Sequence, residues 1–249
     1  VPLALVPGEA VEARALPTAT IAPGVVAALA WGRGALLERV EMQPGAVYPE
    51  QTLAEELIVL VREGTATFTL DGKTVELAKG QLIYLTPGAK RTVIAGPGGW
   101  KAFEVYSPVR LDHLALAGQN TTGAPPSFPD QGVTPSIEPG VVMNLNDIQW
   151  TPLTNPDPAV SFRRSTRQAR LIWGRNAQIS LIRMDPGSEI ANHRHPEDQL
   201  THTVRGSLQQ GVIDATFPAS GDAGHVLYLP GGMVHAAELG PHGADQLDV

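Results

Sequence analysis

Three histidines and one glutamine in the second half of the chain are spaced so that they could ligate a single metal ion. His193 and His195 are two residues apart, so on a β-strand both side chains project from the same face. Gln199 keeps the same alternation after the bend at Pro196, and a barrel would bring the distant His235 opposite them. Imidazole nitrogens with an amide oxygen suit Zn, Fe, Mn, Ni or Cu. The sequence therefore predicts one divalent transition metal with four neutral protein ligands.

Neutral ligands leave the full positive charge on the metal, which favours polarising a carbonyl or acidifying a water molecule. We therefore expect Lewis-acid chemistry, such as isomerisation or a lyase reaction, ahead of oxygen activation. His202 and Glu197 are the nearest other candidates for a catalytic role. Strand alternation directs His202 away from Gln199, and Glu197 is better placed to orient an imidazole.

The composition excludes several other classes of protein. The 249 residues include no cysteine, which rules out thiolate metal sites, cysteine nucleophiles and disulfides. A net charge of −7 without a basic stripe argues against nucleic-acid binding. No apolar run reaches the length of a membrane-spanning helix, so no membrane partner is expected. We expect the partner to be a small-molecule substrate.

The chain begins at Val1, which fits either a removed signal peptide or a trimmed start. A cytoplasmic location is favoured and a periplasmic one stays open.

The second half of the chain repeats the first with an offset of 142 residues, which becomes 144 further on. Trp31-Gly32-Arg33 recurs as Trp173-Gly174-Arg175, and Gly80 recurs as Gly224. Both tryptophans are expected in the core, because both halves carry them. We predict an N-terminal domain over residues 1–118, a Gly/Pro-rich linker over 119–140 and a C-terminal domain over 141–249. The repeat puts Gln51, Leu53, Leu57 and Arg91 at the metal positions of the first half, and two leucines and an arginine cannot hold a cation.

Short stretches rich in β-formers and separated by turn residues predict an all-β fold. Strands are expected over Ala66–Leu70, Gln81–Leu85 and Trp100–Tyr106, with a hairpin turn at Asp71-Gly72. At most one short helix is expected, over Leu111–Leu116. Many closely spaced strands indicate a sandwich or a small barrel.

With these motifs in place, the chain resembles the cupin superfamily, and its duplication makes it similar to a bicupin. The glycines, proline and ligands of both cupin motifs stand at the family's spacing: Gly187, His193, His195, Gln199, Gly206, then Gly224, Pro230, Gly232, His235. The first motif usually has Glu where this chain has Gln199, as in a His-x-His-Pro-x-Asp/Glu-Gln branch in which Gln replaces Glu as a ligand. The resemblance implies two tandem cupin barrels of the double-stranded β-helix, or jelly-roll, type.

We expect a metal-dependent cupin enzyme that acts on a small oxygenated metabolite, such as a keto acid or a sugar derivative. One alternative is an Fe- or Ni-dependent dioxygenase. Another is a non-catalytic cupin that binds a metal or small ligand. A homodimer is possible by analogy with other cupins.

Overall fold

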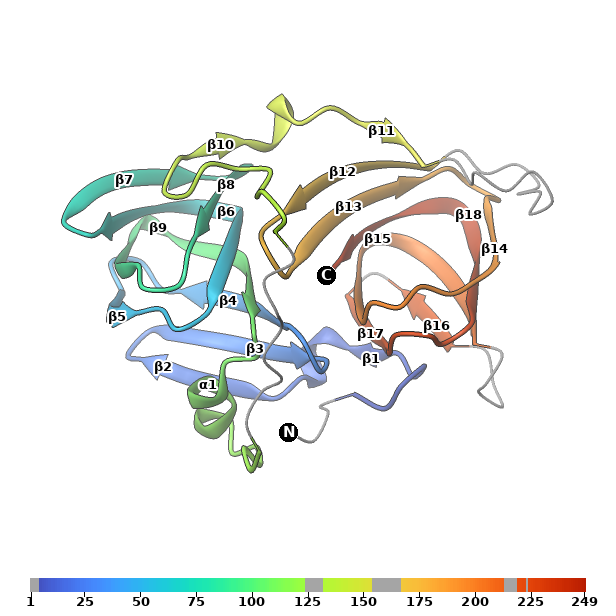
Figure 1. The fold of residues 1–249 in the computed structure, drawn as a ribbon, viewed down its shortest axis with the longest axis horizontal. Coiled ribbons are helices and arrows are strands. Elements are labelled where there is room, and N and C mark those ends of the chain that lie inside the picture. The colour runs from blue at the N-terminus through green and yellow to red at the C-terminus, as the bar shows by residue number, and fades with distance from the viewer. Residues whose placement is uncertain (1–4, 124–131, 154–166, 213–218, 223) are drawn as a thin grey trace. The chain divides into compact units, whose positions relative to one another are not determined.

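The computed structural model describes residues 5–123, 132–153, 167–212, 219–222 and 224–249. It divides into two compact units (Figure 1). Unit 1 comprises residues 1–4, 17–148 and 172–177, and unit 2 comprises residues 5–16, 149–171 and 178–249. Each unit draws a segment from the other half of the sequence. The division of the chain into residues 1–118, 119–140 and 141–249 stays a prediction.

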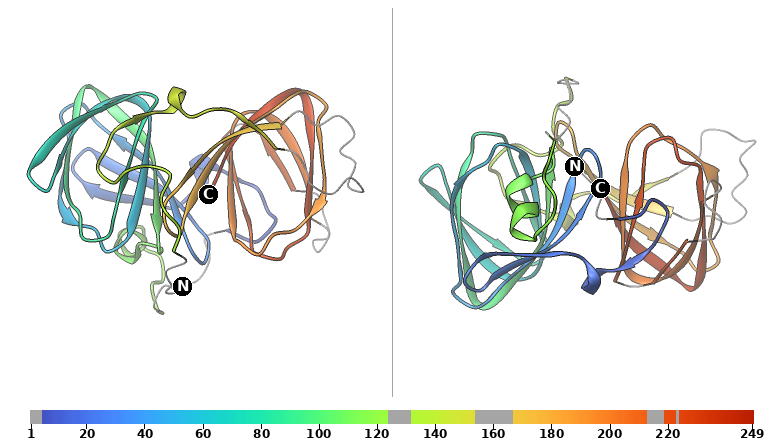
Figure 2. Two further views of the ribbon diagram at one scale, coloured as in Figure 1. Left: turned by 45° about the horizontal axis from the view of Figure 1, so that its top comes forward. Right: turned by 90° about the horizontal axis from the view of Figure 1, so that it is seen from below.

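Unit 1 is built on one antiparallel sheet that curls into a barrel (Figure 2). Its strands pair in the order β10-β8-β6-β9-β4-β3-β2, with β5 on β9 and β7 on β6. Their bounds are β2 Thr18–Ala22, β3 Val25–Trp31, β4 Leu36–Met42, β5 Val47–Thr52, β6 Glu56–Leu70, β7 Lys73–Ala78, β8 Gln81–Leu85, β9 Lys90–Ser107 and β10 Met143–Asn144. The helix α1 (Leu111–Leu116) follows β9.

Unit 2 has the same strand order, element for element. The path is β1-β17-β15-β18-β13-β12-β11, with β14 on β18 and β16 on β15. The bounds are β1 Val11–Glu12, β11 Thr151–Pro152, β12 Arg167–Trp173, β13 Gln178–Met184, β14 Glu189–His193, β15 Gln199–Val212, β16 Ala219–Asp222, β17 His225–Leu229 and β18 His235–Asp248. Short 3-10 turns over Ala13–Ala15 and Leu145–Asp147 follow β1 and β10. The all-β jelly-roll prediction is confirmed.

A glycine recurs in each unit at a register shift between the two longest paired strands, β6 with β9 and β15 with β18. Gly64 and Gly206 both have positive φ, at 75° and 79°. A Cβ on Gly64 would lie 2.0 Å from the carbonyl oxygen of Gly99, and one on Gly206 would lie 1.9 Å from that of Gly243. Only glycine permits both the backbone angle and this close approach. The steric requirement explains why glycine repeats at these positions.

The predicted elements are found where the pattern placed them. Gln81–Leu85 and Leu111–Leu116 are a strand and the helix, and Ala66–Leu70 and Trp100–Tyr106 are parts of longer strands.

The two repeated tryptophans differ from the prediction that both belong to the core. Trp31 is 1% exposed, whereas Trp173 is 38% exposed. The indole N–H of Trp173 donates to the backbone oxygen of Thr134 at 3.0 Å. The polar edge of an indole can hold such a ring at a surface, which a pattern of hydrophobicity does not reveal.

In the described part of the chain, no helix has the length and apolar character needed to cross a membrane.

Candidate metal centre

Two paired strands of unit 2 bring the predicted histidines together. His193 ends β14 and pairs directly with His235, the first residue of β18. His195 follows β14 after one residue. One nitrogen from each of the three rings lies within 4.8 Å of the others. The ring centroids of His193 and His235 are 4.2 Å apart, and those of His195 and His235 are 5.1 Å apart. The strand pairing thus forms a cluster of three imidazoles.

Backbone carbonyls fix the protonation of each ring. Nδ1 of His193 lies 2.9 Å from the oxygen of Ala191, Nδ1 of His195 lies 3.0 Å from that of Glu197, and Nδ1 of His235 lies 3.0 Å from that of Met233. A carbonyl oxygen only accepts hydrogen bonds, so each Nδ1 carries the proton and donates it. The Nε2 atoms are left as the ligating nitrogens.

Gln199 directs its amide oxygen at the cluster. Its Nε2 donates to Thr201 Oγ1 at 2.8 Å and to Asp248 Oδ2 at 3.0 Å. These bonds identify the nitrogen side of the amide, and the oxygen Oε1 lies 2.9 Å from Nε2 of His195. In the tautomer whose only ring proton is on Nδ1, Nε2 of His195 and the amide oxygen of Gln199 are two acceptors that face each other at this distance. A cation bound by both atoms would replace the repulsion between their lone pairs with two ligand bonds. The residues therefore fit a metal.

The electrostatics keep two of the imidazoles unprotonated at neutral pH. Burial lowers the pKa of His193 and lowers that of His235 to about 4. Neutral imidazole is the form that binds metals. His235 is 3% exposed, whereas the side chain of His195 is 30% exposed, so the cluster has a buried side and an accessible side.

Asp248 was not predicted as a site residue. It lies opposite Thr201 in the sheet, its Oδ1 is buried without a hydrogen-bond partner, and burial raises its pKa to about 6. The 144-residue offset would have found it, because it matches Asp248 to Glu104, a buried acid in unit 1. We infer that Asp248 and Thr201 hold the amide of Gln199 with its oxygen toward the imidazoles.

Replacing Asp248 with Asn should weaken binding of Zn²⁺ about 10- to 100-fold, the usual effect of losing a group that orients a ligand. The asparagine can present its own amide N–H to Gln199, so the Gln199 amide loses its orientation. Competition against a chromophoric chelator measures the affinity. Asp245→Asn is the matched control, because Asp245 lies on the same strand and pairs with Arg205 at the surface. Equal affinities for wild type and Asp248→Asn would contradict the positioning role.

The same substitution should change how the stability of metal-free protein depends on pH. The lowered pKa of His235 makes the unfolded state bind more protons between about pH 4 and 6.5, so stability rises with pH there. The raised pKa of Asp248 has the opposite sign between its ordinary value of 3.8 and about 6, so stability falls with rising pH. In Asp248→Asn the opposing contribution is removed, so the stability of the metal-free protein should rise more steeply with pH over this window. Urea unfolding at several pH values tests this, and an unchanged profile would refute it.

The other two predicted residues, His202 and Glu197, are not members of the three-histidine group. His202 is 2% exposed, and its Nδ1 bonds to the backbone oxygen of His225 at 3.0 Å. The Glu197 carboxylate is 75% exposed and lies 3.8 Å from Nδ1 of His195, on the side of the ring away from the ligating nitrogen. Neither placement supports a proton-transfer role.

Unit 1 fills the matching place with an ion pair. Gln51 pairs with Arg91 in the sheet, as His193 pairs with His235 in unit 2. Arg91 is fully buried and donates to both carboxylate oxygens of Glu104, at 2.8 and 2.7 Å. Two leucines occupy the other ligand positions and belong to the hydrophobic core, namely Leu53 and Leu57. These side chains offer no set of metal ligands.

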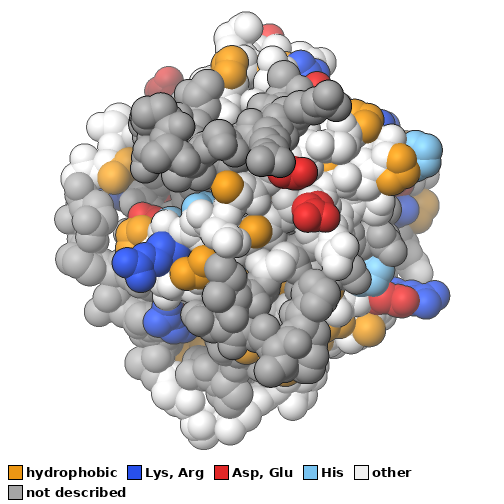
Figure 3. Space-filling view, turned by 90° about the vertical axis from the view of Figure 1, so that its right-hand side faces the viewer, with side chains coloured by type: hydrophobic (Ala, Val, Ile, Leu, Met, Phe, Trp, Pro, Cys, Tyr) orange, Lys and Arg blue, Asp and Glu red, His pale blue; other side chains and the backbone are white. Residues whose placement is uncertain are grey.

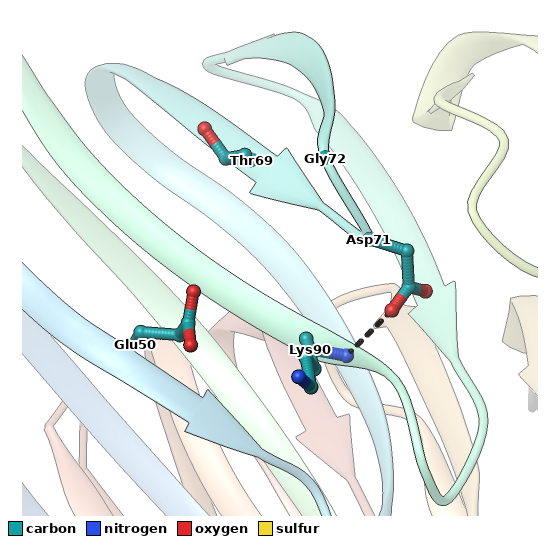
Figure 4. A pocket seen from close by; sticks show the side chains of 5 residues that line it. All are labelled: Glu50, Thr69, Asp71, Gly72 and Lys90. Carbon is teal, nitrogen blue, oxygen red and sulfur yellow. Dashed lines mark hydrogen bonds between the residues drawn. The ribbon is translucent and has the colours of Figure 1, made fainter.

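A surface cavity of about 430 Å³ also lies in unit 1 (Figure 4). It is lined by Glu50, Thr69, Asp71, Gly72 and Lys90. The Asp71 carboxylate accepts a bond from the backbone N–H of Lys90 at 3.2 Å. Its charged side chains are exposed and do not form a convergent set of ligands, so it does not compete with the histidine cluster as a functional site.

The fold and the cluster together define a cupin-type protein with a three-histidine group that could hold a metal. The chain belongs to the family described as the AraC-like ligand binding domain, whose model matches residues 37–169, more than half of the sequence. The matched region includes most of unit 1 and ends before His193. No curated protein matches the chain in sequence.

Solved structures share the fold at low sequence identity. A mutant of oxalate decarboxylase from Bacillus subtilis matches with a TM-score of 0.66 and 15% identity over 98% of this chain and 77% of that one. AerE from Microcystis aeruginosa matches with a TM-score of 0.64 and 12% sequence identity, over 93% of this chain and 94% of that one. A cupin 2 conserved barrel domain protein from Leptotrichia buccalis matches with a TM-score of 0.61 and 12% sequence identity, over 99% of this chain and 97% of that one. At these identities the likeness establishes the fold alone.

Proposed function

We propose that the chain is a bicupin whose second barrel binds one divalent transition metal through His193, His195, Gln199 and His235. We propose further that it is an enzyme acting on a small oxygenated metabolite, such as a keto acid or a sugar derivative, by isomerase- or lyase-type chemistry. The carrying observation is the 2.9 Å approach of the Gln199 amide oxygen to Nε2 of His195, because two acceptors at that distance fit ligation of one cation.

A bound metal would supply Lewis acidity toward a carbonyl or hydroxyl oxygen of the substrate. The protein contributes the orientation of its ligands. Three backbone carbonyls hold the imidazoles in the ligating tautomer, and Asp248 with Thr201 holds the amide. His235 is buried, whereas the side chain of His195 remains accessible.

The identity of the metal is open among Zn, Fe, Mn, Ni and Cu. A solved structure of oxalate decarboxylase from Bacillus subtilis, 15% identical over 98% of this chain, is described as having Mn(II) centres. That enzyme shares the fold, which makes Mn²⁺ a reasonable ion to include in reconstitution. A neutral donor set is also compatible with Zn²⁺ and Ni²⁺.

A non-catalytic ligand-binding role is the second candidate. It is favoured by the family match, because the matched model describes a ligand binding domain and covers the unit without metal ligands. An Fe- or Ni-dependent dioxygenase would use the same cluster and differs by consuming oxygen.

Metal analysis of the purified protein, followed by reconstitution with Zn²⁺, Mn²⁺, Fe²⁺ and Ni²⁺, tests the proposal. We expect one metal per chain. The reconstituted forms should then be incubated with 2-oxo acids and aldoses while products and oxygen uptake are measured. Turnover without oxygen uptake supports the Lewis-acid enzyme, and uptake linked to product supports the dioxygenase. Tight binding without turnover supports the ligand-binding role, and a chain that takes up no metal refutes the metal site.

A further inference from the structure

Two further polar side chains line the interior of unit 2 next to the row that holds Gln199. Thr201 and Asp248 face this interior, because both accept a hydrogen bond from the Gln199 amide. Side chains alternate along a strand, so Thr203 and Gln246, each two residues away, lie on the same face. They stand opposite each other in the pairing of β15 with β18 and are 2% and 7% exposed. A hydroxyl and an amide thus meet inside the barrel, about 7 Å along the strands from the Thr201 row.

Unit 1 has apolar side chains at the matching positions. The repeat offsets of 142 and 144 residues match Thr203 to Val61 and Gln246 to Ala102. Val61 and Ala102 are both buried and belong to the hydrophobic core of unit 1. The barrel fold therefore does not require polar groups at this row. Burying them costs free energy unless they find hydrogen-bond partners.

The barrel itself does not supply those partners. Within the described part of the chain, no side-chain hydrogen bond involves Thr203 or Gln246, and each side chain keeps a small exposed area. Their polar atoms are therefore available to a molecule that enters the barrel.

The interior of unit 2 also has smaller side chains than that of unit 1. Trp100 and Tyr48 are buried in the core of unit 1, and the repeat matches them to Ala244 and Ile190. Ala244 lies two residues before Gln246 and belongs to an apolar cluster against which Ile190 packs. The polar row thus lies between the metal ligands and a small aliphatic base. An alanine in place of an indole leaves room there for a small molecule.

The other end of this interior reaches the surface. Histidine side chains are visible on the face of unit 2 shown in Figure 3, and the side chain of His195 is 30% exposed. A substrate could therefore contact the metal at the accessible side of the cluster and extend inward to Thr203 and Gln246.

The chemistry of the polar row selects the kind of group that it binds. A hydroxyl and a carboxamide are neutral, and each can both donate and accept a hydrogen bond. A ligand hydroxyl has the same double capacity, whereas a carboxylate only accepts and is matched best by a guanidinium. A buried site built to bind a hydroxyl also discriminates against an analogue that lacks it.

We propose that Thr203 and Gln246 bind a hydroxyl group of the substrate that is remote from the oxygen on the metal. The substrate class is then a polyhydroxylated carbonyl compound of the sugar type, rather than a keto acid without further hydroxyls. This inference rests on the proposed metal site and narrows the substrate that the site accepts.

The test measures the binding of two probes to the Co²⁺-loaded protein. Erythrulose and 1-hydroxy-2-butanone have the same carbon chain and the same carbonyl with its neighbouring hydroxyl, and only erythrulose carries two further hydroxyls. Binding is followed by the change in the visible Co²⁺ spectrum. We expect wild type to bind erythrulose about 10-fold more tightly, the effect of one or two hydrogen bonds.

Two variants remove the polar groups and keep the packing. Thr203→Val copies the residue that unit 1 accommodates at this position, and Gln246→Leu keeps a side chain of similar size. Each should bind erythrulose about 3- to 10-fold more weakly, with unchanged affinity for 1-hydroxy-2-butanone and for Co²⁺. Gln209→Leu is the matched control, because Gln209 is exposed on the same strand as Thr203, and it should bind both probes as wild type does. Circular dichroism checks each fold.

The outcomes distinguish failure of the inference from failure of the metal site. If wild type binds no Co²⁺, the metal site is wrong and the role of the polar row falls with it. If wild type binds Co²⁺ without preferring erythrulose, or if both variants keep that preference, the metal site stands and the inference is overturned. An equal loss of affinity for both probes would also overturn it, because recognition would then not depend on the remote hydroxyls.

Discussion

Replacing His195 with Ala is expected to lower the affinity for Zn²⁺ by about 100-fold or more, because it removes one of the four proposed ligands. A closed four-ligand site supplies roughly 10–16 kcal/mol in zinc-dependent peptides, so one ligand contributes several kcal/mol. His195 is the best ligand to remove, because its side chain is 30% exposed and its loss should leave the packing of the barrel intact. His235, at 3% exposed, would leave an internal cavity.

Thermal unfolding offers a second readout of the same substitution. A metal that binds only the folded state stabilises it by about 4 kcal/mol when present at a thousandfold excess over its dissociation constant. EDTA should therefore lower the unfolding temperature of wild type and leave that of His195→Ala unchanged. His242→Ala is the matched control, because His242 is exposed and lies outside the cluster. An EDTA response in His195→Ala equal to that of wild type would contradict the proposed ligand set.

The sequence was most informative where one residue type has one physical role. Gly64 and Gly206 repeat because only glycine tolerates the close backbone contact at each register shift. The apolar run closed by a Pro-Gly turn predicted β8, and Leu111–Leu116 was expected as at most one short helix. The three histidines could be grouped in advance, because strand alternation and the motif spacing leave few other arrangements. The structure brings them within 4.8 Å of one another.

Other features depend on tertiary contacts that a linear pattern does not contain. Asp248 was missed because its role comes from a cross-strand neighbour, Thr201, and from a bond to Gln199, 49 positions away in the sequence. The exchange of residues 5–16 and 172–177 between the units was also not predicted, since short extended segments look alike whichever sheet they join. Trp173 was placed in the core by analogy with Trp31, although its indole N–H bonds to a backbone carbonyl at the surface.

The interior of unit 1 holds an ion pair at a position that corresponds to a proposed metal ligand of unit 2. Arg91 and Glu104 have fully buried side chains and form a bidentate pair. The hydroxyl of Tyr106 bonds to both, and the ring of Tyr48 lies 4.7 Å from the guanidinium carbon. Burial opposes ionisation of Glu104, but Arg91 outweighs it and the pKa of Glu104 lies below its ordinary value.

A second buried group lies beside this pair. His113 of α1 bonds to Glu38 at 2.6 Å and to the hydroxyl of Tyr48 at 3.0 Å. The charged groups in the interior of this barrel are therefore paired with one another, and Arg91 has its counter-charge within the protein.

Replacing Arg91 with Met should destabilise the protein by about 3–5 kcal/mol, because it leaves Glu104 buried without its counter-charge. The combined change Arg91→Met with Glu104→Leu and Tyr106→Phe should recover most of that loss. Replacing a whole buried ion pair by apolar residues of similar volume is often neutral or stabilising. Guanidinium unfolding followed by tryptophan fluorescence measures both, since Trp31 and Trp100 lie in the core of this unit.

The comparison of the single and triple variants distinguishes two accounts of why unit 1 keeps these charges. If the single substitution lowers the free energy of unfolding and the triple one does not, each charge is needed only to neutralise the other. The pair then adds no net stability. If the triple variant is as unstable as the single one, the network itself holds the barrel together. A loss below about 1 kcal/mol for Arg91→Met would mean that water or another donor reaches Glu104, and that the interior is less closed than its zero exposure indicates.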